Sequence, residues 1–322
     1  MKKNKTTLIL IGILLILTLL YFFAPSSKTS LNTSETAFKI KDTASVVNIT
    51  ITQTLDSKPI DTLVLSKKSG EWFVNGSYPA LQPAINYLLT VLERIQVREP
   101  IHQNAQQNAR NYLADNNLHI EIQQVIEGET ETKAYFIGTA TPDKQGTIAL
   151  LQGASNPFIV EIPGQHGQIA PIFSTEPNVW RENVLVNIHP DNIEFVSVQQ
   201  QKDDSNFMLQ RLAPNQPLLL QNQSNTDTNK TQHYLKTFTK LYAQAFINDL
   251  MPNGLDSLKK LRKPDIIFTI KPFHNSPQIL NLYYRPETPN NYLGFLSNSK
   301  ELLIVQQPII NPYFLPRKYF VK

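Results

Sequence analysis

Uncharged, mostly apolar residues fill the stretch from Leu8 to Ala24. Its seventeen residues approach the roughly 20 that a helix needs to cross a bilayer core, and a helix satisfies its own backbone hydrogen bonds in lipid. We therefore predict a transmembrane anchor. Residues along its length include Leu8, Leu10, Ile13, Leu17 and Phe23.

Lys2, Lys3 and Lys5 precede this stretch, and the positive-inside rule then keeps the N-terminus in the cytoplasm. The alternative is a cleaved signal peptide, but Phe22 is bulky where a cleavage site needs a small residue. A lipoprotein is excluded because the chain has no cysteine to acylate. We predict residues 1–24 as cytoplasmic tip and anchor, and the Ser/Thr-rich residues 25–43 as a flexible linker.

Polar and apolar residues then alternate in short segments, which indicates strands. One amphipathic helix is predicted from Leu81 to Val97 because apolar residues recur there at helical spacing. A second, more polar helix covers 104–113. The strands predicted in this first module, residues 44–190, are 46–54, 60–66, 71–74, 118–126, 133–137, 147–151 and 158–162.

The pattern begins again after residue 190, each element following its counterpart by roughly 147 residues. Strands are predicted at 193–200, 206–212, 217–220, 265–270 and 279–284, and a helix at 231–247. We interpret residues 191–322 as a second module and a possible internal duplication. The alternative is that α+β chains often contain similar runs of strands.

Most strand connections are short and hairpin-like, which favours antiparallel sheets. The predicted fold class is α+β, with an N-terminal transmembrane helix and two similar modules of mainly antiparallel sheet, each packed by one or two helices. Hydrophobic residues make up 41% of the 322 residues, enough to build a core without disulfides.

Net charge is +4, but its distribution is uneven. Residues 41–190 contain ten basic and fifteen acidic residues, whereas residues 191–322 contain fifteen basic and ten acidic ones. The two halves therefore have net charges of opposite sign. Either their electrostatic fields suit each other or different partners, or the uneven distribution arose by chance. The basic excess is too thin to predict nucleic-acid binding in an exported chain.

No nucleotide-binding, zinc-protease or serine-hydrolase motif occurs in the sequence. The six histidines are scattered, with no pair at i, i+3 or i, i+4. We therefore predict no catalytic, cofactor-binding or metal-binding residues, and a protein that is not an enzyme.

Two segments are candidate contact sites. Gly164 and Gly167 flank His166 in a sharp loop, which is either a ligand-contacting loop or a plain turn. Trp180 and Arg181 are residue types that often anchor interfaces; alternatively, Trp180 fills a gap between the modules and Arg181 forms an internal ion pair.

Two further segments are open to more than one interpretation. The basic tract 258–263 (LKKLRK) either touches anionic lipid or forms the solvated end of a short helix. The C-terminal residues 311–322 form either a docking tail or an edge strand.

The order of several segments, GEWFVNGSYPA, REP, KAYFIG, GTIALLQG, FIVEIPG and WRE, resembles a bacterial family catalogued as domain of unknown function 4340. The resemblance covers about residues 45–200. It implies single-pass envelope proteins, some of them encoded near ABC-type transporter or gliding components, and it transfers no catalytic residues.

We therefore expect a single-pass protein of the inner (cytoplasmic) membrane with its bulk in the periplasm. Its expected function is non-enzymatic binding or scaffolding in an envelope complex, with a transporter or motility component as partner. The alternatives are a module that binds cell-wall glycan or another ligand and, third, a hydrolase with a dispersed site.

Overall fold

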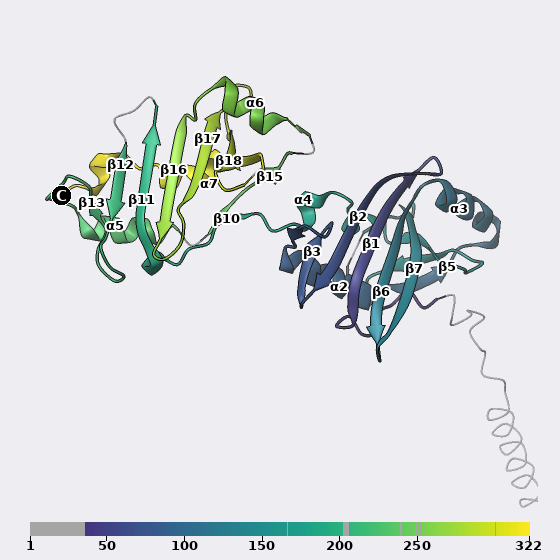
Figure 1. The fold of residues 1–322 in the computed structure, drawn as a ribbon. Helices are drawn as coiled ribbons and strands as arrows, with labels where there is room; N and C mark the ends of the chain where they lie inside the picture. The colour runs from purple at the N-terminus through teal and green to yellow at the C-terminus, as the bar shows by residue number, and fades with distance from the viewer. Residues whose placement is uncertain are drawn as a thin grey trace, which may run out of the picture. The chain divides into compact units, whose positions relative to one another are not determined.

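The computed structural model describes residues 36–165, 167–201, 206–238, 240–248, 250–251, 253–299 and 301–322. They belong to two compact units, the first ending at Pro177 and the second beginning at Asn178 (Figure 1). The predicted anchor, including Leu8, Leu10, Ile13, Leu17 and Phe23, lies outside the described residues. Within the described ranges, no helix is long and apolar enough to cross a membrane.

The first unit is built on one antiparallel sheet. In the described residues it has nine strands, in the spatial order β4-β3-β2-β1-β6-β7-β8-β9-β5. Their bounds are β1 Val46–Leu55, β2 Lys58–Lys68, β3 Glu71–Val74, β4 Tyr78–Pro79, β5 Gln96–Pro100, β6 Asn117–Ile126, β7 Glu129–Ala140, β8 Thr147–Leu151 and β9 Phe158–Glu161.

Alternation along β1 fixes the register of this sheet. Ile51 lies opposite Leu63 of β2 and Ile120 of β6, and all three side chains are fully buried. Because side chains alternate between faces, their polar neighbours point to the other face. A slip of one residue would expose this apolar row, so burial specifies the pairing.

Two helices accompany the first sheet, α2 (Gln82–Arg94) and α3 (Gln103–Asp115). Helix α2 buries Ile85, Leu88, Val91 and Leu92, as its apolar spacing predicts. Helix α3 packs against β7 at Gly138, where an added Cβ would lie 2.8 Å from Leu113 Cδ2. Glycine therefore permits the close approach of α3 to the sheet.

The second unit contains eight antiparallel strands in its main sheet, as far as the described residues go. Their order is β13-β12-β11-β16-β17-β18-β19-β15. Their bounds are β11 Ile193–Gln200, β12 Phe207–Gln210, β13 Leu219–Leu220, β15 Ala245–Phe246, β16 Ile266–Pro272, β17 Gln278–Tyr284, β18 Asn291–Leu296 and β19 Leu303–Gln306. A separate two-stranded sheet pairs β10 (Val184–Val186) with β14 (Leu241–Tyr242).

The two main sheets share one topology. Without β4, the strand order of the first sheet matches that of the second, position by position. The order β3-β2-β1-β6-β7-β8-β9-β5 corresponds to β13-β12-β11-β16-β17-β18-β19-β15. Ile193 begins β11 147 residues after Val46 begins β1. The helices match as well, since α5 (Thr228–Leu235) follows β13 and α6 (Gly254–Leu261) precedes β16.

Helices α5 and α6 lie on opposite faces of the second sheet. Tyr234 of α5 belongs to the larger core cluster with Leu282 of β17, whereas Leu255 of α6 packs in a smaller cluster with Tyr283. Leu282 and Tyr283 are neighbours in a strand, so their side chains point to opposite faces.

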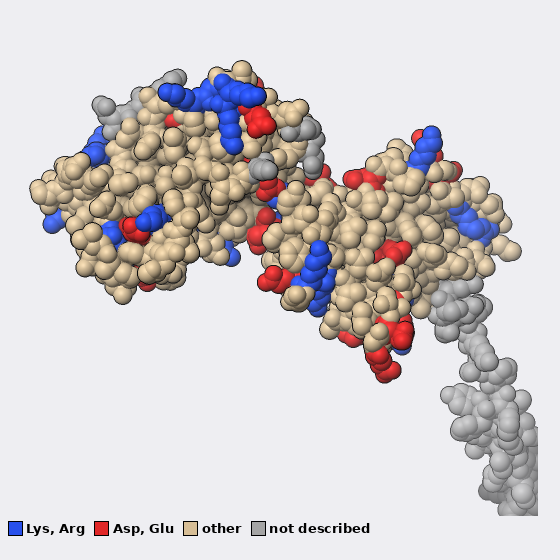
Figure 2. All heavy atoms as spheres, viewed as in Figure 1, with Lys and Arg blue, Asp and Glu red and all other residues tan. Residues whose placement is uncertain are grey.

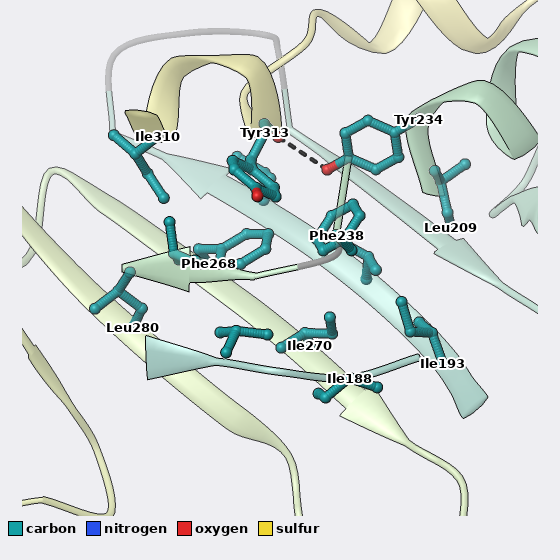
Figure 3. Packing of buried hydrophobic residues seen from close by; sticks show 14 of the residues in the cluster. Ile188, Ile193, Leu209, Tyr234, Phe238, Phe268, Ile270, Leu280, Ile310 and Tyr313 are labelled. Atoms are coloured by element: carbon teal, nitrogen blue, oxygen red, sulfur yellow. Dashed lines mark hydrogen bonds between the residues drawn. The ribbon is translucent and has the colours of Figure 1, made fainter. Parts of the chain in front are cut away.

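Aromatic rings fill the larger of these two clusters (Figure 3). The ring of Phe238 meets that of Tyr234 edge-on, with centroids 4.9 Å apart, and stacks on Phe268 at 5.8 Å. The hydroxyl of Tyr234 donates a hydrogen bond to the carbonyl oxygen of Tyr313 at 2.9 Å. This bond ties α5 to the C-terminal segment.

Two sequence-based predictions in the second unit are wrong. The helix predicted at 231–247 ends at Leu235, and the chain continues through β14 and β15, because β15 completes the sheet edge beside β19. The C-terminal residues 311–322 do not form an edge strand, and a docking role for them stays a prediction. They make short turns, η3 (Asn311–Tyr313) and η4 (Arg317–Phe320), which bury Tyr313 and Phe320 in the core.

The remaining short elements are α4 (Pro177–Trp180), α7 (Gln307–Ile310), η1 (Ala170–Ile172) and η2 (Pro190–Asn192).

Candidate functional site

The first unit has a cavity of about 480 Å³ at one end of its sheet. It lies where the end of β1, the start of β6 and the C-terminus of α3 meet the η1 segment. Strand pairing places two of its polar residues together, since Gln53 of β1 lies opposite Asp61 of β2. Helix α3 ends at Asp115, and the next two residues, Asn116 and Asn117, also line the cavity.

Carboxylates and amides dominate the polar part of the cavity wall. Asp61 and Glu176 supply carboxylates, and Gln53, Asn116 and Asn117 supply amides. No Lys or Arg occurs among the lining residues, all of which the structure describes. The cavity therefore favours ligands that bring hydrogen-bond donors or positive charge.

Asn117 has an acceptor that its protein surroundings leave unsatisfied. Its Nδ2 donates to the carbonyl oxygen of Leu113 at 2.8 Å, which fixes the side chain. Its Oδ1 is buried and has no hydrogen-bond partner in the part of the chain that the structure describes. A buried acceptor of this kind costs free energy until a donor reaches it.

Tyr112 adds an apolar surface to the cavity. Its side chain belongs to the last turn of α3 and is 41% exposed. Aromatic rings beside amide and carboxylate groups suit ligands that carry both hydroxyl groups and flat apolar faces, because the ring supplies contact area and the polar groups fix orientation. The arrangement can bind such a ligand.

The C-terminus of α6, the helix that matches α3, borders a pocket of the opposite charge. This pocket of about 620 Å³ lies where the C-terminus of α6 meets β17 and β18, and its wall includes Lys259, Lys260, Arg262 and Lys263. Figure 2 shows Lys and Arg side chains gathered over α6. The pockets beside the C-termini of the matched helices α3 and α6 therefore suit ligands of different charge, although they lie against different strands of the two sheets.

The predicted contact residues Trp180 and Arg181 lie at the end of α4 and directly after it. Trp180 is 2% exposed. Nη2 of Arg181 lies 2.8 Å from Oε1 of Glu301, and its guanidinium carbon lies 3.5 Å from the centroid of the Phe246 ring. Arg181 thus forms the internal ion pair that was the alternative to an interface role, and the interface role itself stays a prediction.

The glycine loop that follows β9 has the geometry of a turn. Gly164 and Gly167 have φ values of 77° and 111°, and nothing described lies within 4 Å of a Cβ built on either. The backbone conformation is therefore the reason for both glycines. His166 lies outside the described residues, and a ligand role for the loop stays a prediction.

Sequence reasoning did not single out the cavity of the first unit. Its polar residues come from four segments and form no motif, and only the Asn116-Asn117 pair after a helical stretch marks the place. The basic tract at 258–263 was recognised, but its position beside Tyr283 and Phe295 was not. In the described residues, no group of three or more His, Asp or Glu side chains is placed to hold a metal ion.

The wider comparisons give one match. No curated protein and no solved structure matches the chain. A family model matches residues 72–257, more than half of the sequence and parts of both units. By this match, the chain belongs to the family described as Domain of unknown function (DUF4340).

Proposed function

We propose that this protein is a single-pass, membrane-anchored extracytoplasmic component of a bacterial envelope complex, in which it binds or positions a partner without catalysis. The N-terminal apolar stretch and its preceding lysines support the inner-membrane location. A transporter or motility protein is the proposed partner class, as the family resemblance implies.

One observation carries the binding role: in two sheets of the same topology, the matched helices α3 and α6 each border an open pocket, and the two pockets have opposite charge. Open, charged surfaces on rigid sheets suit recognition, because the scaffold holds the contact groups in place. The shared strand order also supports an origin by duplication of one module.

Crosslinking in intact cells tests the binding role. The chain is crosslinked and purified from membranes, and its partners are identified by mass spectrometry. We expect a stoichiometric membrane-complex subunit that is lost when Asp61 and Glu176 are changed to Asn and Gln. Recovery of the chain without any stoichiometric partner contradicts the role.

Topology has its own test. Reporter fusions at the C-terminus should be active outside the cytoplasm, and the native protein should fractionate with membranes and keep its first residues. Mature protein that is free of membrane and begins near Pro25 contradicts the anchor.

A second candidate, cell-wall glycan binding, is favoured by the cavity of the first unit. Its amides, carboxylates and Tyr112 ring match the hydroxyl groups and apolar faces of sugars. Retention of the protein on purified cell wall should fall about tenfold in Tyr112→Ala. Tyr87→Ala is the control, because Tyr87 is similarly exposed and lies on α2. Equal retention of both variants contradicts this candidate.

A further inference from the structure

Helix α6 and the residues before it expose large apolar side chains. Leu250 is 82% exposed and Leu261 is 81% exposed, and Met251 is 46% exposed. With Leu258 and Leu293 these residues line one open groove of about 480 Å³. Single exposed leucines are ordinary, but a groove lined by several is a surface that favours an apolar contact.

Positive charge borders this groove. Lys259, Lys260, Arg262 and Lys263 line the adjoining pocket, which shares Leu261 with the groove. Asp265 pairs with Arg262. In the described part of the second unit, neither Lys260 nor Lys263 forms an ion pair, so their charges are available to an external anion.

The way α6 packs leaves both features on the outside. Leu255 is the buried residue of the helix and joins Tyr283 and Phe295 on the sheet. Lys259 lies over the Phe295 ring, with Nζ 4.6 Å from its centroid, and Arg262 lies over Tyr283 at 5.2 Å. These ring contacts hold two of the cations beside the groove.

We propose that this α6 surface, defined as Leu250, Met251, Leu261 and the four cations from Lys259 to Lys263, docks on an anionic phospholipid bilayer. The leucines and the methionine enter the boundary between headgroups and acyl chains, where their transfer out of water is favourable. The cations meet lipid phosphates, which a polybasic segment attracts over about one Debye length. This contact belongs to the second unit and does not require the N-terminal segment to be embedded.

The absence of cysteine in the chain allows a direct test. The full chain with Ser257→Cys, a residue that is exposed on α6 and lines the groove, is labelled with an environment-sensitive fluorophore. It is reconstituted in nanodiscs of phosphatidylcholine alone or with phosphatidylglycerol. We expect a blue shift and increased emission only with the anionic lipid, and loss of both in high salt. Ser224 is exposed elsewhere in the second unit. The same label at Ser224→Cys should show the emission of a water-exposed fluorophore in every nanodisc.

Charge reversal separates lipid docking from a general effect of charge. Lys259→Glu with Lys260→Glu should weaken docking by at least about 30-fold, since each basic residue near an anionic surface strengthens binding about fivefold. Lys236→Glu with Lys240→Glu makes the same charge change at exposed positions outside the surface and should have little effect.

Three results overturn the proposal. The first is that the emission of the label at 257 does not shift with anionic lipid. The second is that the label at 224 shifts by the same amount. The third is that Lys259→Glu with Lys260→Glu and Lys236→Glu with Lys240→Glu dock equally well. Loss of a protein crosslink in the Lys259/Lys260 variant, with no lipid-dependent shift in the parent, assigns the surface to a protein partner instead.

Discussion

Arg181 and Glu301 form an ion pair although 120 residues separate them in the sequence. Nη2 of Arg181 lies 2.8 Å from Oε1 and 3.0 Å from Oε2 of the Glu301 carboxylate. The pair links the segment after α4 to the chain just before β19, and the ring of Phe246 covers the guanidinium. Arg181 is 8% exposed as a residue, so water screens this pair less than a surface pair.

Arg181→Met should lower the free energy of unfolding by about 1–3 kcal/mol, because it leaves a partly buried carboxylate without its cation. Chemical denaturation of the full chain measures this. The control is Glu287→Gln, which breaks the exposed Arg285–Glu287 pair and should leave stability unchanged within error. Equal changes in the free energy of unfolding for the two variants would show that the Arg181–Glu301 pair stabilises the protein no more than an exposed pair does.

Tyr135 and Tyr234 are both fully buried, but only Tyr234 has a partner for its hydroxyl. In the described residues, the Tyr135 hydroxyl has none, and burial raises the pKa of Tyr135 above its usual range. Tyr135→Phe should therefore stabilise the first unit by about 1 kcal/mol, whereas Tyr234→Phe should destabilise the second by a similar amount. Denaturation curves of the two variants check this, and destabilisation by Tyr135→Phe would reveal a partner for its hydroxyl.

The carboxylate of Asp143 should stay ionised to a lower pH than an ordinary aspartate. The Thr141 hydroxyl, the Gln145 backbone N–H and the Arg98 guanidinium donate to its carboxylate and lower its pKa from 3.8 to about 2. Between pH 4 and 2 the unfolded chain binds this proton before the folded chain does, so the group's stabilising effect is lost as pH falls through that window.

Carboxyl-carbon NMR titration of Asp143 measures the midpoint directly. Thr141→Val should raise it toward the ordinary value, because the hydroxyl donor is the largest cause of the shift, and Arg98→Gln should raise it less. A midpoint near 4 in the unmodified chain would mean that the three donors do not hold the carboxylate in solution.

Arg211 is a buried cation that binds backbone carbonyl oxygens. Its Nε donates to Ile193 at 2.6 Å, its Nη1 to Gln216 at 3.2 Å and its Nη2 to Pro190 at 2.5 Å. Arg211→Lys should cost about 2–3 kcal/mol, since one ammonium cannot span three carbonyls. Arg317 donates one exposed hydrogen bond to the carbonyl oxygen of Gln221, and Arg317→Lys should cost about 0.5 kcal/mol or less by the same denaturation measurement.

Short segments rich in apolar and β-branched residues were predictable from sequence as strands. The strands at 71–74, 147–151 and 193–200 match the structure at both ends, because their apolar faces have one core to cover. The helix predicted at 231–247 was too long, since Leu241 and Ala245 keep helical spacing yet lie in short strands. Strand β5 (QVREP) has no apolar alternation, and its pairing with β9 makes it a strand.

The candidate sites were less accessible to sequence reasoning than the fold. Gln53, Asp61, Asn117 and Glu176 come from separate segments and are ordinary in type. Strand pairing brings Gln53 and Asp61 together, and the fold adds Asn117 and Glu176 to the same cavity. The basic tract after α6 was visible because its charges are consecutive. The contribution of the exposed Leu250 could not be seen in the sequence, because only the fold shows that it lies in the same groove as Leu261.

In the part of the chain that the structure describes, each main sheet takes its strands from its own half, and the last strand of the first sheet ends at Glu161. During synthesis, the N-terminal half therefore has every strand partner that the structure describes before residue 178 has emerged. No described strand of the first sheet depends on the second half of the chain for its pairing. Unpaired strand edges, which can aggregate, are therefore exposed for a shorter time.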